Sequence, residues 1–141
     1  MKKLIISAIA VAFFMLGASD VFACSCLADN DKSERKKVKT AYKEATAVFT
    51  GKVMEVTRKS DSLLVKFKIE TIWKGISTKE TVVRTAENSA MCGFNFEVGK
   101  KYLVYAGGKG ENPETNICTR TSAQNADVKY LNKIKKPTAF N

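Results

Sequence analysis

The residues best suited to chemistry in this sequence are its four cysteines, Cys24, Cys26, Cys92 and Cys118. In an exported domain, an even number of cysteines predicts a pair of disulfides. Cys24 and Cys26 are separated by one residue, and a loop that short strains the bond geometry, so each is expected to bond to Cys92 or Cys118. The order of the two bonds stays open at this point. Structural zinc sites usually present cysteines in closely spaced pairs, so isolated cysteines argue against a bound zinc.

The sequence contains no histidine. Histidine supplies most hydrolytic general bases and most catalytic zinc ligands, and no Asp or Glu stands in a recognisable catalytic pattern. One enzymatic hypothesis remains, in which Cys24 acts as an N-terminal nucleophile with its own amine as the base. That reaction needs a free thiol, which two disulfides would remove. We therefore expect no enzymatic activity and no cofactor of the protein's own.

The first residues have the pattern of an export signal. A basic start precedes the mainly apolar run Leu4–Leu16, and small residues lead to Ala23. The pattern predicts a secretory signal peptide over residues 1–23 and a mature domain over residues 24–141 that begins with Cys24. The run is too short for a membrane span, and no second long apolar run follows, so no transmembrane segment is expected.

A lipoprotein signal is the alternative interpretation of the same stretch, because a cysteine directly after the cleavage site can be acylated. Phe22 is bulky at a position where such signals usually have a small residue. We therefore favour a secreted or periplasmic protein over a lipid-anchored one. The difference matters because acylation would block the α-amino group of Cys24.

The predicted mature chain is long enough for one domain with a single core. Without Lys2, Lys3 and Asp20, it has 22 basic residues against 13 acidic ones. In an exported protein this balance points to an anionic polysaccharide or another acidic partner rather than to nucleic acid. Lysines that keep the domain soluble are the simpler explanation.

Two segments have helical patterns. In Asp29–Glu44, Ser33 is a candidate cap, and lysines surround an apolar face made of Val38, Ala41, Tyr42 and Ala45. In Ser122–Lys136, the expected buried stripe is Ala126, Tyr130, Leu131 and Ile134.

The central segments alternate between apolar and polar residues, as strands do. In the first, Ala47, Phe49, Gly51 and Val53 share a face, Met54 and Val56 share the other, and the switch predicts a bulge near Gly51. The second, Ser62–Trp73, has one expected core face: Leu63, Val65, Phe67, Ile69 and Trp73. Three shorter strands are expected at Thr81–Thr85, Lys101–Ala106 and Asn116–Thr121. Together they predict a mainly β, five-stranded, closed barrel of the OB-fold type with flanking helices; a β-sandwich is the alternative.

Several motifs then fit one family. The predicted mature start Cys-Ser-Cys, followed by VFTGKV, FKIETIWKG, MCGFNF, GKKYLVYAGG and ICTRT, resembles the N-terminal domain of tissue inhibitors of metalloproteinases, which belongs to the netrin-like OB-fold domains. The resemblance extends in order over nearly the whole predicted mature chain. It implies that Cys24 bonds to Cys92 and Cys26 to Cys118.

The resemblance also implies a function for the predicted N-terminus. In such inhibitors, the free α-amino group and the carbonyl oxygen of the first cysteine, here Cys24, bind the catalytic zinc of a target metalloprotease and displace the attacking water. Ser25 would then point toward the specificity pocket of the protease. The expected inhibitory ridge comprises Cys24, Ser25, Cys26, Leu27, Ala90, Met91 and Cys92.

The leading hypothesis is thus a secreted metalloprotease inhibitor whose partner is a zinc protease and whose only metal is the zinc of that protease. The alternative is a netrin-like module without inhibitory action that binds anionic polysaccharide or an envelope component, with or without a lipid on Cys24.

Overall fold

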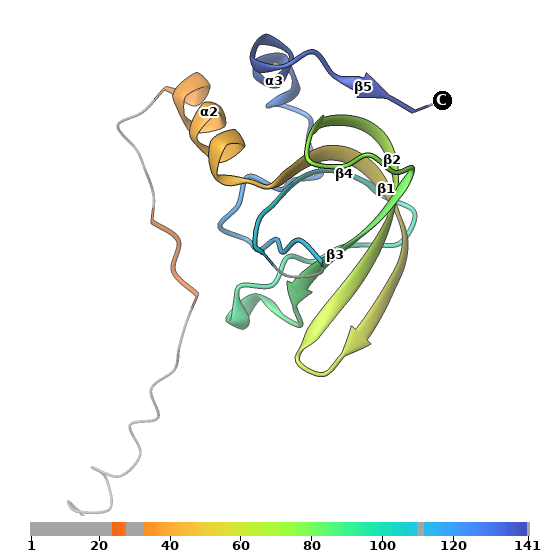
Figure 1. Cartoon of the computed structure of the whole chain (residues 1–141). Helices are drawn as coiled ribbons and strands as arrows, with labels where there is room; N and C mark the ends of the chain where they lie inside the picture. The colour runs from red at the N-terminus through yellow and green to blue at the C-terminus, as the bar shows by residue number, and fades with distance from the viewer. Residues whose placement is uncertain (1–23, 28–32, 110–111, 141) are drawn as a thin grey trace, which may run out of the picture.

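The computed structural model describes residues 24–27, 33–109 and 112–140, and the predicted signal peptide over residues 1–23 lies outside the described residues. The described elements, drawn in Figure 1, are α2 (Glu34–Glu44), β1 (Ala47–Lys59), β2 (Ser62–Lys74), β3 (Glu80–Ala86), the short 3-10 helix η2 (Ser89–Met91), β4 (Lys101–Ala106), α3 (Val128–Ile134) and β5 (Thr138–Ala139). None of the described helices is long and apolar enough to cross a membrane.

The strands form one antiparallel sheet in the order β3-β2-β1-β4, with β5 paired to the far end of β2. Figure 1 shows the sheet curled into an incomplete ring, with α2 and α3 outside one end of it. The fold is therefore mainly β and consistent with an OB-like barrel, as the sequence predicts.

Three shifts in the pairing register bend the long β1–β2 hairpin. The first lies between Val48 and Phe49, opposite the extra residue Trp73, and the second between Thr50 and Gly51, opposite the extra residue Glu70. The third lies between Val53 and Glu55. Gly51 is required at the second shift because a Cβ there would lie 2.9 Å from the carbonyl oxygen of Lys68. The predicted bulge near Gly51 is confirmed, and the bulges let two strands curl around one core.

The bulge at Glu70 also overturns one prediction. The extra residue reverses the alternation of β2, so Ile72 follows Ile69 into the barrel interior. Trp73 packs on the opposite face, beneath the helices. The assignment of Trp73 to the same face as Ile69 was therefore wrong, although its burial was predicted. The third register shift, at Met54, leaves this side chain exposed, which also differs from its expected apolar face.

The predicted strand Asn116–Thr121 is wrong as well, since this segment forms turns. The opposite edges of the sheet are instead joined through Pro113 and Glu114. The amide of Arg84 in β3 donates to the Pro113 carbonyl at 2.9 Å, and the amide of Gly107 after β4 donates to the Glu114 carbonyl at 2.8 Å. The barrel is thus closed by a single bridging segment rather than by a full strand.

Two hydrophobic clusters occupy the two faces of the sheet. The barrel interior contains edge-to-face aromatic contacts among Phe49, Phe67, Phe96 and Tyr102, with ring centroids 4.9 to 5.4 Å apart. On the outer face, Trp73 packs with Val38 of α2 and Leu131 of α3. These contacts fix α2 and α3 at the end of the barrel.

The first helix agrees with its sequence pattern, and the second is shorter than its pattern. The first begins at Glu34, directly after Ser33, as the cap prediction requires, although the Ser33 side chain makes no capping hydrogen bond. The second begins only at Val128, so the prediction of a helix from Ser122 was wrong, and Ala126 is exposed rather than buried.

Candidate functional site

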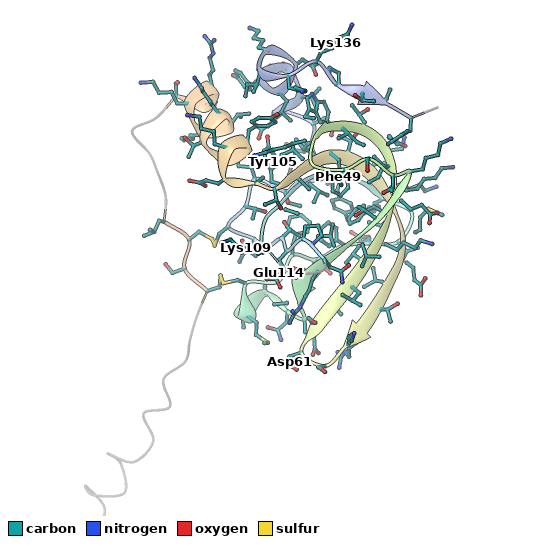
Figure 2. All side chains as sticks on the ribbon, in the orientation of Figure 1. Phe49, Asp61, Tyr105, Lys109, Glu114 and Lys136 are labelled. Atoms are coloured by element: carbon teal, nitrogen blue, oxygen red, sulfur yellow. A yellow bond between two sulfur atoms is a disulfide. The ribbon has the colours of Figure 1, made fainter. Side chains whose placement is uncertain are left out.

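The segment Cys24–Leu27 has no regular secondary structure and is joined to the body of the protein by two disulfides. Cys24 bonds to Cys92 and Cys26 bonds to Cys118, with a Cα–Cα distance of 5.2 Å in each bond. Figure 2 shows both as yellow bonds between the segment and the fold. The pairing implied by the family resemblance is therefore confirmed.

No backbone hydrogen bond among the described residues ties Cys24–Leu27 to the rest of the protein. Within the described part of the chain, the two disulfides are therefore what holds this segment in position, and on the chain-entropy model each stabilises the fold by about 4 kcal/mol. The side chains of Ser25, Cys26 and Leu27 are all exposed. The backbone between the two disulfides is therefore held at two points while its outer surface stays open to a partner.

The first attachment point is the turn from Asn88 to Gly93. The Asn88 side chain accepts a hydrogen bond from the amide of Met91 at 3.1 Å and so caps η2. Cys92 then adopts a left-handed conformation with φ of 65°. A Cβ on Gly93 would lie 2.1 Å from the Ala86 carbonyl oxygen, so only glycine allows this close approach. The local sequence thus places Cys92 in a fixed turn.

The same turn is anchored to the barrel core. The amide of Phe94 donates to the hydroxyl of Thr85 at 2.8 Å. Its ring packs against Phe96 and Tyr102 at centroid distances of 4.6 and 5.8 Å. The Cys-Gly-Phe-Asn-Phe run therefore connects the disulfide at Cys92 to the aromatic core through the ring of Phe94.

The second attachment point is the loop that contains Cys118. The side-chain oxygen of Asn116 accepts from the amides of Cys118 and Thr119, at 2.9 and 3.1 Å, and closes the turn. The amide of Ile117 donates to the carbonyl of Cys92 at 3.0 Å and joins the two attachment points to each other. The sulfurs of Cys24 and Cys118 are 3.9 Å apart. Both disulfides thus converge on one small area.

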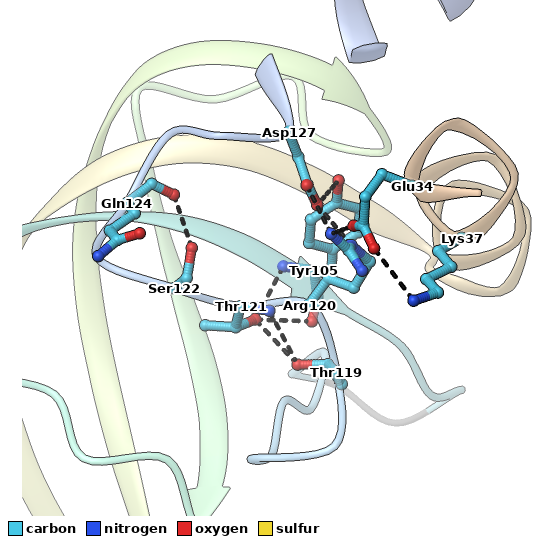
Figure 3. Close-up of polar contacts among 9 residues, drawn as sticks. All are labelled: Glu34, Lys37, Tyr105, Thr119, Arg120, Thr121, Ser122, Gln124 and Asp127. Carbon is cyan, nitrogen blue, oxygen red and sulfur yellow. Dashed lines mark hydrogen bonds and ion pairs between the residues drawn. The ribbon is translucent and has the colours of Figure 1, made fainter. Parts of the chain in front are cut away.

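Arg120 fixes this loop to the helical end of the barrel, as Figure 3 shows. Its guanidinium donates to both carboxylate oxygens of buried Asp127, at 2.6 and 2.7 Å, and to Glu34 of α2 at 2.9 Å. The hydroxyl of Tyr105 also donates to Asp127, at 3.1 Å. Through Arg120, the loop that contains Cys118 is tied to α2, β4 and the start of α3.

The charges of this cluster stabilise one another. The hydrogen bonds that Arg120 donates to Asp127 are the main cause of the raised pKa of Arg120. Burial, and then the Asp127 charge, raise the pKa of the Tyr105 hydroxyl. Hydrogen bonds from Lys37 and Arg120 lower the pKa of Glu34. All three groups therefore keep one protonation state around neutral pH, which suits a structural clamp rather than an acid–base site.

Exposed apolar side chains gather around the disulfides. Leu27 is fully exposed, Met91 is 49% exposed and Ile117 is 40% exposed. Large exposed apolar side chains are unfavourable on an isolated domain when they lie close together, and they are typical of contact surfaces. We use the name "stapled ridge" for Cys24–Leu27, Ala90–Cys92 and Ile117.

The structure brings together the cysteines of the predicted ridge with Ala90 and Met91, and places Ser25 and Leu27 beside them. The sequence did not indicate Ile117 as a ridge residue, because its pattern predicts a strand over Asn116–Thr121. It also did not indicate Arg120, which joins Asp127, seven residues later, to Glu34, which is 86 residues away in the sequence. The Asn-x-Cys-Thr pattern, which is typical of a side-chain-capped turn, was the available signal.

The arrangement offers little to a metal of the protein's own. Within the described part of the chain, the group with the spacing of metal ligands is Cys24, Cys26 and Cys118. All of these sulfurs are in disulfides, so they provide no thiolate ligands.

Comparison with known proteins gave one informative relative. No family model matches the chain. The chain is 29% identical over 119 residues to the tissue inhibitor of metalloproteinase of Drosophila melanogaster, an alignment that covers 77% of this chain and 50% of that protein. It thus spans about half the length of the curated relative. The resemblance inferred from the sequence motifs is confirmed: the protein is similar to a tissue inhibitor of metalloproteinase.

Proposed function

We propose that the chain, after cleavage at Ala23, is a secreted inhibitor of zinc metalloproteases and not an enzyme. This proposal rests chiefly on one observation: both cysteines of Cys-Ser-Cys are bonded to separate, firmly anchored turns, while the backbone between them makes no backbone hydrogen bond with any described residue. The similarity to a tissue inhibitor of metalloproteinase supports the same function.

The proposed reactive groups are the α-amino nitrogen and the carbonyl oxygen of Cys24. Together they form a compact chelate that would occupy the open position of the target's catalytic zinc and displace its bound water. The amine must be neutral to bind metal. An α-amino pKa of about 7.7–8.0 leaves roughly a tenth of the amine or more neutral at pH 7, and zinc binding draws the rest toward that form.

The disulfides would contribute by preorganisation. Ordering a free backbone costs about 1–2 kcal/mol per residue, and a flexible terminus would lose that free energy on binding. Cys24 and Cys26 are each held at a Cα–Cα distance of 5.2 Å from a fixed turn, so most of this ordering is complete before the protease arrives.

The exposed side chains of the stapled ridge would supply the remaining contacts. Ser25 follows the metal-binding residue and would enter the specificity pocket beside the zinc. Leu27, Met91 and Ile117 offer apolar area on either side of it, and buried apolar anchors dominate the binding free energy of most interfaces.

A nucleophilic role for Cys24 lacks support. Such a role requires a free thiol, whereas the Cys24 sulfur is bonded to Cys92.

The test is to compare the chain that begins at Cys24 with one that has a single extra alanine before it. The added residue turns the α-amino group into an amide, which does not bind zinc, while both disulfides stay in place. We expect inhibition of a panel of zinc metalloproteases to fall at least 100-fold, by analogy with the loss of a metal ligand. Equal inhibition by the two forms would contradict the proposal, provided that both show the same thermal stability.

A further inference from the structure

A second surface of the molecule is strongly basic and is separate from the stapled ridge. It lies on α2 and α3, which pack against each other at the end of the barrel. Figure 2 shows nitrogen-tipped side chains around both helices, with Lys136 at the end opposite the hairpin tip at Asp61. The ridge, in contrast, lies where the disulfides join Cys24–Leu27 to the fold.

The charges of α2 are segregated around the helix. At about 100° per residue, Arg35, Lys39 and Lys43 follow one another along the axis, and Lys36 lies beside them, within an arc of about 100°. All four side chains are exposed. They span about 12 Å along the helix.

The acidic residues of α2 lie on the other side of the buried residue Val38. Glu34 is paired there with Lys37 and Arg120, at 3.0 and 2.9 Å. Glu44 lines a hollow with Arg120 and the loop that contains Cys118. The basic arc therefore has no acidic residue of α2 within it, and no ion pair with any described residue neutralises it.

The second helix adds cations to the same end of the molecule. Lys129 and Lys133 are exposed on α3, four residues apart and opposite the buried Leu131, and exposed Lys136 follows one turn later. Like charges four residues apart destabilise a helix, so both helices carry arrangements that are unfavourable without a counter-charge.

We propose that the basic arc of α2, extended by the lysines of α3, binds a linear anionic polysaccharide while the stapled ridge remains free. A row of cations along a helix matches repeating sulfate or carboxylate groups. A membrane partner is disfavoured because a membrane-binding helix also exposes large apolar residues, and among the described residues none of these lies on α2 or α3. A stacking partner such as single-stranded nucleic acid is also disfavoured, because it would require exposed aromatic side chains as platforms for its bases.

The test uses heparin as the sulfated probe and polygalacturonate as the carboxylated one, with the oxidised chain that begins at Cys24. The variant K36Q/K39Q/K43Q removes three charges from the arc, and glutamine matches lysine in helix propensity. The control K52Q/K59Q/K68Q removes three exposed lysines from the sheet, which have no ion pair among the described residues.

At low salt, each lysine near an anionic surface contributes roughly fivefold, so the α2 variant should bind heparin about 100-fold more weakly, with a flatter dependence on salt. The control should lose less than tenfold. The α3 variant K129Q/K133Q/K136Q should also bind more weakly than the control. Preference for polygalacturonate over heparin would assign the ligand to the carboxylated class of polysaccharides and would also support polysaccharide binding at this surface.

Three results would overturn the proposal: no binding of the unmodified chain to either probe at 150 mM salt, equal losses in the α2 variant and the control, or tighter binding to phosphatidylserine vesicles than to heparin. The surface is also independent of the proposed inhibition. The α2 variant should inhibit metalloproteases normally, and the alanine-extended chain should bind heparin normally. If one proposal, protease inhibition or polysaccharide binding, is contradicted, the other can therefore still be tested separately.

Discussion

At the residue scale, Gly93 fixes the turn that bears Cys92. An alanine there would place its Cβ 2.1 Å from one carbonyl oxygen and 2.8 Å from another, so the turn would have to move. We expect Gly93→Ala to lower the free energy of unfolding by about 1–3 kcal/mol. Gly107→Ala is the matched control, because no atom beyond its two chain neighbours lies within 4 Å of a Cβ at that position. Guanidinium denaturation with the disulfides intact measures both, and equal stability of the two variants would contradict this role of Gly93.

Ile117 is the ridge residue for which the resemblance gave no role. Because its side chain is exposed, Ile117→Ser should change the free energy of unfolding by no more than about 0.5 kcal/mol. It should weaken protease inhibition by about tenfold, as expected for an interface residue worth more than about 1 kcal/mol. Val98→Ser, at an exposed apolar position on the β3–β4 connection, is the control and should leave inhibition unchanged. If both variants inhibit equally, Ile117 is not part of the contact surface.

At the scale of elements, Arg120 holds the loop that contains Cys118 against α2 and α3. Arg120→Lys keeps the charge but loses the paired hydrogen bonds to both oxygens of Asp127. We expect a loss of about 2–4 kcal/mol in the free energy of unfolding, somewhat below the usual effect of breaking a fully buried pair, since Arg120 is partly exposed. Lys100→Gln, which removes an exposed pair with Glu97, should cost less than about 1 kcal/mol. Similar thermal melting of the two variants would rule out the clamp.

The alternation of apolar residues predicted β1 to β4. This was possible because each of these strands buries one face in the barrel interior, which leaves its pattern within the strand's own sequence. It could not predict where the faces switch in β2, because Ile69, Ile72 and Trp73 are apolar and fit either phase. The switch depends on Glu70, which is extra only relative to its partner strand β1. Register between strands is a tertiary property and leaves no mark in a single segment.

The candidate site was predictable to the extent that disulfides define it. Cysteine spacing excluded a bond between Cys24 and Cys26, and the family resemblance supplied the pairing. Ile117 was missed because a short run such as Asn-Ile-Cys-Thr-Arg-Thr has a strand-like composition. Its turn depends on the Asn116 side chain bonding to two amides, and this outcompetes strand propensity when no partner strand is available.

At the scale of the whole molecule, inhibition should depend on pH through the α-amino group of Cys24. Protons compete with zinc for this nitrogen, so the inhibition constant should increase about tenfold for each pH unit below the amine pKa, and level off above about pH 8. A chain acetylated at this amine is the control and should show weak inhibition without this slope. Measurements from pH 6 to 8.5 on one stable metalloprotease suffice. A flat profile for the unmodified chain would contradict chelation by the amine.

The central claim is that the clamped terminus at Cys24 binds the metal of another protein. A crystal structure of the chain in complex with an inhibited zinc protease tests it most directly. The account predicts that the nitrogen and the carbonyl oxygen of Cys24 both lie about 2.0–2.2 Å from the catalytic zinc, in place of its water. A zinc that retains its water, with Cys24 outside coordinating distance, would contradict the account.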